Sequence, residues 1–241
     1  MSLNTKRKLW VFGDSNSAVE SFTTDNNEFN YQVQFEKYTG KKLINFSELL
    51  ANELNLELNN FGLHGADNYT ILDFIGRNID SINKEQDIVI INLTSPTRFR
   101  IATNEGTRLY SVSVNCTYPK SSLISPKTVE EILINRTNIG FVWEIINIKN
   151  LVTHSLPNIP VLIWSPFPEL SSIPGIINIE KGATTYPDIE EELSTIKVET
   201  QGKVDDGHLG STGNIGLAKL FNKILNERSK SKLDYILNIE K

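Results

Sequence analysis

Cysteine is almost absent from this sequence of 241 residues: Cys116 stands alone, and histidine occurs only three times. A single cysteine cannot form a disulfide within the chain, and no cluster of cysteine and histidine suggests a structural zinc site. We interpret Cys116 as a small buried apolar residue or an ordinary surface thiol. Neither an internal disulfide nor a structural zinc ion is therefore expected.

Long hydrophobic runs are missing as well. The basic residues Lys6, Arg7 and Lys8 precede an apolar run of only four residues, which ends at Gly13. Such a run is too short for the core of a signal peptide or for a membrane span. We expect a protein that is cytoplasmic or particle-associated and that has no membrane partner.

Positive charge is not in excess, because 24 lysines and arginines stand against 29 aspartates and glutamates, for a formal net charge of −5. This balance disfavours a nucleic-acid partner bound through a basic face. The sequence also has no Gly-x-x-x-x-Gly-Lys-Ser/Thr loop and no Gly-x-Gly-x-x-Gly after the first apolar run, so nucleotide binding has no support. We expect no cofactor and no metal.

Apolar residues, at 39% of the chain against 22% charged, suffice for one sizeable core. Short apolar runs alternate with stretches of helical spacing along the sequence. Strands are expected at 9–12, 56–61, 87–93 and 159–164, and helices at 46–54, 69–82, 128–155 (with Gly140 as a candidate break) and 215–225. This alternation predicts an α/β protein with a doubly wound, mostly parallel sheet.

The other stretches have no clear period. We interpret 21–30 as loop, 97–128 as an insertion with a strand-like part at 109–114, 169–203 as irregular apart from a candidate strand at 195–198, 205–213 as a Gly-rich loop, and 229–241 as a short extra helix. No repeat or linker divides the chain. We predict a single domain over residues 1–241 with an insertion at 97–128 that lies over one end of the sheet.

The first expected strand leads directly into Gly13-Asp14-Ser15. A serine at the carboxyl end of a buried strand is where an α/β protein places a nucleophile or a ligand contact, although the same tripeptide also suits an ordinary turn. Other polar or small residues that follow expected strand ends, and are expected to line one crevice with it, are Gly65, Thr94, Ser95 and Ser165.

A nucleophilic serine needs a base within hydrogen-bond reach, and the base needs an acceptor that orients it. His208 is the candidate base, and Asp205, three residues earlier, is the candidate orienting acceptor. Asp206 competes for that role, but residues so close in a turn usually diverge. On local spacing alone, a solvated Asp-Asp-Gly-His loop with no partner remains the simpler interpretation.

Three blocks spread over the chain, at 13–15, 60–66 and 205–210, resemble those of the SGNH (GDSL-type) hydrolase family. The resemblance implies a flavodoxin-like three-layer sandwich and hydrolysis of esters, often acetyl esters on carbohydrates. It implies Ser15 as nucleophile, His208 as base and Asp205 as the residue that orients the base. The backbone amides of Ser15 and Gly65 would donate to the oxyanion, which agrees with two N–H groups placed in turns past strand ends.

The third family block departs from the pattern. Where the family has Gly-x-Asn-Asp, this sequence has Thr-Ser-Pro-x-Arg at 94–98, and Asn92 falls inside the expected strand. Thr94 and Ser95 are candidates to donate a hydroxyl hydrogen bond to the oxyanion instead, and Arg98 is a candidate to supply positive charge to the substrate. Loss of one donor typically costs about 10²–10³ in rate, which leaves catalysis possible.

Two further residues are candidates for the substrate site. Asp14 is expected to fix its turn through backbone hydrogen bonds, and His64 would lie at the mouth of the cleft, as a substrate contact or simply a polar loop residue. The sequence thus predicts a serine esterase acting on a small-molecule or glycan O-acyl ester. The alternatives are an acyltransferase with the same triad and a non-catalytic binding module that retains the fold.

Overall fold

The central element of the fold is a parallel sheet of five strands. The structure is a computed structural model, and it describes residues 6–19, 31–95, 98–102, 109–112, 127, 140–182, 184–199 and 207–230. The strands are β1 (Lys8–Gly13), β2 (Glu57–Gly62), β3 (Ile88–Asn92), β6 (Val161–Ser165) and β7 (Ile176–Asn178), in the order β2-β1-β3-β6-β7. Counted along the chain, this is the 2-1-3-4-5 order of flavodoxin-like sheets. The predicted α/β fold is therefore confirmed.

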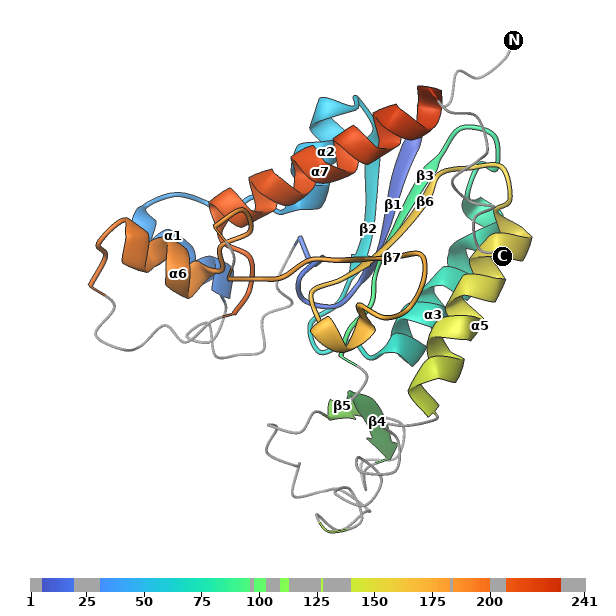
Figure 1. The fold of residues 1–241 in the computed structure, drawn as a ribbon, viewed down its shortest axis with the longest axis horizontal. Coiled ribbons are helices and arrows are strands. Elements are labelled where there is room, and N and C mark those ends of the chain that lie inside the picture. The colour runs from blue at the N-terminus through green and yellow to red at the C-terminus, as the bar shows by residue number, and fades with distance from the viewer. Residues whose placement is uncertain are drawn as a thin grey trace.

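Helices cover both faces of this sheet, as Figure 1 shows. On one face lie α3 (Asn68–Asn78), which continues into η2 (Ile79–Ser81), and α5 (Gly140–Ser155). On the other lie α2 (Phe46–Glu53) and α7 (Ser211–Lys230). In the described part of the chain, no helix combines the length and the apolarity needed to cross a membrane.

The core consists of two apolar layers, one on each face of the sheet. Successive residues of a strand point to opposite faces, so Trp10 and Phe12 pack toward α3 and α5 while Leu9 and Val11 pack toward α2 and α7. Strand β3 is buried along its whole length, as a central parallel strand must be. This explains why its sequence is a continuous apolar run rather than an alternating one.

The sequence-based interpretation of residues 169–203 is wrong in part. This stretch contains η3 (Pro168–Leu170), β7 and α6 (Ile189–Thr195). Asp188 caps α6 by accepting from the N–H of Glu191, and three glutamates occupy the first turn, where the helix dipole favours them. The candidate strand at 195–198 does not form, because Thr195 is the last residue of α6 and Lys197 has a φ of 55°.

Two more helices differ from expectation. α1 (Tyr31–Thr39) follows the stretch interpreted as loop and was not predicted. Helix α7 begins at Ser211, so it takes in the end of the predicted Gly-rich loop and is longer than the predicted 215–225. The four expected strands and the helices expected at 46–54 and 69–82 form within a few residues of their predicted bounds, and the described part of the helix predicted at 128–155 is α5 (Gly140–Ser155).

Only part of the predicted insertion belongs to the described residues. There, β4 (Phe99–Ala102) and β5 (Leu109–Val112) pair antiparallel as a separate two-stranded sheet. The rest of the stretch, including Cys116, lies outside the described residues. So do the predicted loop at 21–30, the beginning of the helix predicted at 128–155 and residues 231–241.

Candidate active site

Residues 14–17 form a tight turn where β1 ends, which we call the nucleophile turn. The N–H of Ser17 donates to the carbonyl of Asp14 over 3.0 Å. The Oγ of Ser17 donates to Oδ1 of Asn92 at the end of β3, over 3.2 Å. Ser15 is 7% exposed, at the edge of the sheet where ligands bind in this fold. Asn92 therefore supports this turn from within the sheet.

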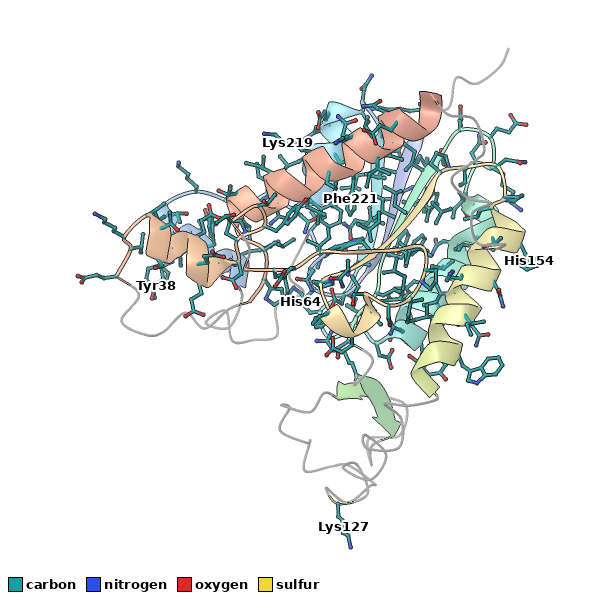
Figure 2. The ribbon with its side chains drawn as sticks, viewed as in Figure 1. Tyr38, His64, Lys127, His154, Lys219 and Phe221 are labelled. Atoms are coloured by element: carbon teal, nitrogen blue, oxygen red, sulfur yellow. The ribbon has the colours of Figure 1, made fainter. Side chains whose placement is uncertain are left out.

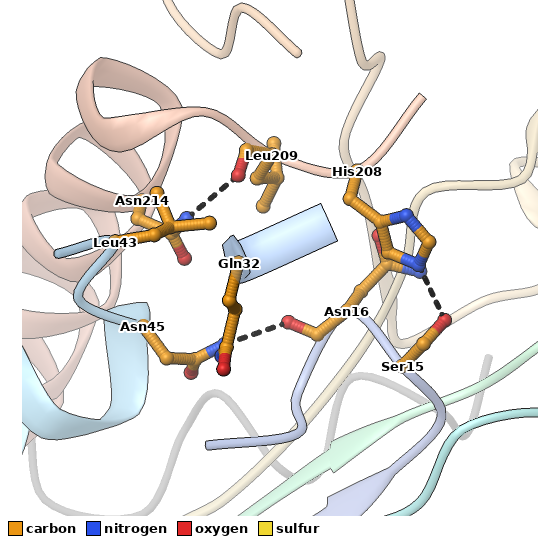
Figure 3. Close-up of a pocket in the computed structure, with 8 residues that line it drawn as sticks. All are labelled: Ser15, Asn16, Gln32, Leu43, Asn45, His208, Leu209 and Asn214. Atoms are coloured by element: carbon orange, nitrogen blue, oxygen red, sulfur yellow. Dashed lines mark hydrogen bonds between the residues drawn. The ribbon is translucent and has the colours of Figure 1, made fainter. Parts of the chain in front are cut away.

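His208 reaches Ser15 from the other end of the chain. Its Nε2 lies 2.7 Å from the Oγ of Ser15, although 193 residues separate the two (Figure 3). This is the distance of a good hydrogen bond between a hydroxyl and an imidazole. A proton can pass directly between the two groups, which is the geometry that a general base requires.

The backbone around His208 is fixed on the segment that leads into α6. The N–H of Ile189 donates to the carbonyl of His208 over 2.8 Å, and the N–H of Gly210 donates to the carbonyl of Pro187 over 3.0 Å. In the same segment, burial raises the pKa of the Tyr186 hydroxyl, so this group stays neutral near pH 7. The imidazole thus extends from a short, well-supported backbone segment.

Asn214, in the first turn of α7, ties this segment to the other side of the site. Its Nδ2 donates to the carbonyls of Leu209 and Gly210, both over 2.9 Å, and its Oδ1 accepts from the N–H of Phe46 over 2.8 Å. Only 2% of Asn214 is exposed. It therefore holds the start of α2 against the backbone that carries His208.

We expect Asn214→Ala to lower the free energy of unfolding by about 1–3 kcal/mol, since three buried hydrogen bonds are lost. Urea denaturation of the purified variant measures this change. The matched control is Asn222→Ala on the same helix, where the amide donates to Glu53 at the exposed surface, with an expected change within about 0.5 kcal/mol. Equal stability of the two variants would contradict this role for Asn214.

Asp14 and Arg98, both predicted to contact substrate, contact each other. Arg98 Nη1 lies 3.6 Å from Oδ2 of Asp14 and donates to the carbonyl of Ala66 over 3.2 Å. Asp14 Oδ1 accepts from the backbone N–H and from the Nδ2 of Asn16, over 2.9 and 3.0 Å. The expectation that Asp14 fixes its turn through a backbone hydrogen bond is confirmed.

A second turn, residues 63–66, lies beside the nucleophile turn. The N–H of Leu63 donates to the carbonyl of Gly13 over 3.0 Å, and the N–H of Ala66 closes the turn on the carbonyl of Leu63 over 3.1 Å. Gly65 has a φ of +73°, which favours glycine. The ring centroids of His64 and His208 are 6.3 Å apart, and Figure 2 shows His64 beside the end of the sheet. The predicted site residues of this block thus lie at the same edge as Ser15.

Thr94 and Ser95 follow β3 at this edge, but they differ in exposure. Thr94 is fully buried, and its backbone exchanges two hydrogen bonds with the side chain of Asn68. Ser95 is half-buried. Thr94 and Ser165 therefore do not line the crevice as expected, because both are fully buried; the Ser165 hydroxyl donates to the carbonyl of Leu93 over 3.1 Å.

Ser15 and His208 border a small pocket, shown in Figure 3. Its other walls are Asn16, Gln32, Leu43, Asn45, Leu209 and Asn214.

Sequence reasoning did not single out the side-chain amides that line this pocket. One of them carried a signal: Asn45 with Glu48 three residues later forms the capping box of α2. No pattern in the sequence marked Gln32 or Asn214 as a residue of the site.

The candidate orienting residue Asp205, and its competitor Asp206, lie outside the described residues. Among the residues that are described, no three His, Cys, Asp or Glu side chains gather as a metal site would require.

A scan against protein-family models found no match, and a search of curated proteins found none either. Solved structures do resemble this chain. An acetyl xylan esterase, Est2A, from the rumen bacterium Butyrivibrio proteoclasticus is 13% identical, with 93% of this chain and 64% of that chain covered and a TM-score of 0.43. The present chain thus spans less than two thirds of the length of that esterase.

Two further solved structures are similar over most of their own length. AlinE4, described as an SGNH-hydrolase family esterase, is 16% identical, with 96% of this chain and 100% of that chain covered and a TM-score of 0.36. A protein from Bacteroides fragilis described as a putative acylhydrolase is 13% identical, with 94% and 89% covered and a TM-score of 0.37. The strand order of the sheet, rather than these likenesses, carries the assignment of the fold.

Proposed function

We propose that this protein is a serine esterase of the SGNH type that hydrolyses O-acyl esters of small molecules or glycans. The observation that supports the proposal most strongly is the 2.7 Å distance between the Ser15 Oγ and the His208 Nε2. A hydroxyl is a weak nucleophile until a base removes its proton, and this pair meets that need at the edge of the sheet where substrates bind.

In the proposed reaction, the Ser15 Oγ forms a bond to the ester carbonyl carbon while His208 Nε2 takes the hydroxyl proton. The carbonyl oxygen becomes an oxyanion, which accepts hydrogen bonds from the backbone N–H groups of Ser15 and Gly65. The bond to the alcohol then breaks, and the imidazolium returns its proton to the leaving oxygen. Water, deprotonated by the same imidazole, then attacks the acyl carbon. The bond from that carbon to Ser15 Oγ breaks, the imidazolium returns its proton to Oγ, and the acid is released. Asp205 would hold the imidazole in the required tautomer.

A third hydrogen bond to the oxyanion, which the sequence assigns to Thr94 or Ser95, fits Ser95 better. Ser95 is half-buried whereas Thr94 is fully buried, and a donor must be able to reach the bound substrate. We therefore assign any hydroxyl donor from this block to Ser95.

The wild-type protein is expected to turn over p-nitrophenyl acetate, with acetate as the product in water. Release of p-nitrophenol measures the rate, and proton NMR of the mixture identifies the acetyl product. Transfer of most acetyl groups to an added sugar alcohol, rather than to water, would identify an acyltransferase. No release above the buffer rate across acetyl, butyryl and glycan-linked esters would contradict the proposal and favour the binding module.

A further inference from the structure

The guanidinium of Arg98 contacts both turns that would supply the oxyanion donors. One contact is with the Asp14 carboxylate in the nucleophile turn, at 3.6 Å, and the other is with the carbonyl of Ala66 at the end of turn 63–66, at 3.2 Å. Both contacts come from the same nitrogen, Nη1. The side chain of Arg98 is 21% exposed. Arg98 is thus mostly enclosed and already bonded to the protein itself.

Asp14 transmits this contact to the nucleophile turn. Its side chain is 1% exposed, and a carboxylate so deeply buried requires a partner for its charge. Oδ1 is used by Asn16, directly after the nucleophile, and within the described residues Oδ2 has the ion pair with Arg98 but no hydrogen bond. Removal of the guanidinium would leave Oδ2 buried without its cation. We expect the carboxylate to hold the Asn16 amide less firmly in that case.

The same guanidinium fixes the second turn. Ala66 directly follows Gly65, whose N–H is the proposed second oxyanion donor. On its far side this turn is joined to β1 through the Leu63 N–H and the Gly13 carbonyl. Arg98 closes the other side by holding Ala66 against Asp14. Both contacts therefore help to fix the distance between the two turns, and Arg98 supplies one of them.

We propose that Arg98 is a positioning residue: it clamps the nucleophile turn to the turn at 63–66 and so sets the geometry of the two backbone oxyanion donors. It does so in place of contacting the substrate. This inference rests on the proposed esterase function. It also gives a physical role to the arginine of the Thr-Ser-Pro-x-Arg block. That block takes the place of the Gly-x-Asn-Asp block of the family.

The kinetic test uses Arg98→Gln, Arg98→Lys, Asp14→Asn and the double variant Arg98→Gln, Asp14→Asn. For p-nitrophenyl acetate, Arg98→Gln is expected to lower kcat roughly 10²-fold, as for loss of a well-aligned oxyanion donor, with KM changed by less than about three-fold. The double variant is expected to be no worse than the poorer single variant, because both substitutions break one clamp. Guanidinium chloride at low millimolar concentration should partly restore Arg98→Gln. The matched control is Arg77→Gln, in an exposed pair with Asp73, with kcat unchanged.

A second measurement does not depend on catalysis. The N–H of Asn16 is bonded to Asp14 Oδ1, and the N–H of Ala66 to the carbonyl of Leu63, so hydrogen exchange by NMR reports whether each turn is held. In Arg98→Gln both amides are expected to exchange at least about ten times faster, while Ile90 in β3 is unchanged.

The outcomes separate the clamp from the esterase proposal. A raised KM with unchanged kcat in Arg98→Gln would overturn the clamp and make Arg98 a substrate contact, as would unchanged exchange at Asn16 and Ala66. Multiplying effects in the double variant would also overturn it. Failure of the esterase proposal has a different signature, because the wild type itself would not turn over substrate. In that event the hydrogen-exchange result alone decides whether Arg98 clamps the two turns.

Discussion

Replacing Ser15 with alanine is expected to lower kcat/KM for p-nitrophenyl acetate by about 10⁴-fold or more, since the acyl-enzyme can no longer form. His208→Ala should cost a similar factor, because the hydroxyl then keeps its proton. The two residues lie 2.7 Å apart and act in one step. The double variant should therefore be no slower than either single variant. Initial rates on purified, folded protein measure all three.

Matched controls exist for both substitutions. Ser171→Ala removes an exposed hydroxyl next to η3, and His154→Ala removes a histidine whose Nδ1 lies 2.8 Å from the carbonyl of Asn150 within α5. Both are expected to retain wild-type rates. Wild-type turnover in Ser15→Ala would remove Ser15 from the mechanism. A full effect in Ser15→Ala with none in His208→Ala would require a different base.

Gly62→Ala is expected to disable the site through packing alone. Gly62 ends β2 opposite Gly13 in the sheet register. A Cβ at this position would lie 2.5 Å from the backbone nitrogen of Ala18 and 2.5 Å from the carbonyl carbon of Ser17. Backbone atoms cannot yield as a flexible side chain can, so the nucleophile turn must move. We expect kcat to fall at least about 10²-fold, as misplacement by about 1 Å can cost, and the free energy of unfolding to fall by about 1–3 kcal/mol.

The control for this substitution is Gly76→Ala. Gly76 lies in α3, where a Cβ would have no atom within 4 Å. Alanine in an open helix position is expected to stabilise the protein by about 0.5–1 kcal/mol and to leave the rate unchanged. Thermal unfolding and ester turnover on both variants test the pair. A Gly62→Ala protein with wild-type stability and rate would show that β2 does not press on the nucleophile turn.

The sheet could be predicted from the sequence because its strands are buried on both faces. A short, continuous apolar run such as 88–92 is typical of a strand that is covered on both faces, and it suits few other positions in a fold. Helices α2 and α3 could also be predicted, from the helical spacing of their apolar residues. Their asparagine and aspartate N-caps mark where they begin.

The shorter elements could not be predicted because tertiary contacts decide them. Strand β7 has three residues and exists through its pairing with β6. Helix α6 has seven residues, too few for a clear period, and its apolar residues Ile189 and Leu193 pack with Phe35 of the unpredicted α1. Such segments depend on neighbours that are distant in sequence.

For the site, local spacing indicated Ser15 and His208 only as separate candidates. Their contact spans 193 residues, and it was the order of three blocks resembling a family that brought them together. The pairing of Arg98 with Asp14 had no such guide, since each charge alone suits a substrate contact. An ion pair between two loops is visible only when the fold is known.

The most direct test of the account is to find which residue a fluorophosphonate labels. An activated serine displaces fluoride and forms a phosphonyl ester, which mass spectrometry of the digested protein locates. The account predicts one adduct, on Ser15, that forms far more slowly in folded His208→Ala protein. An adduct on another residue, or equal labelling rates with and without His208, would contradict it.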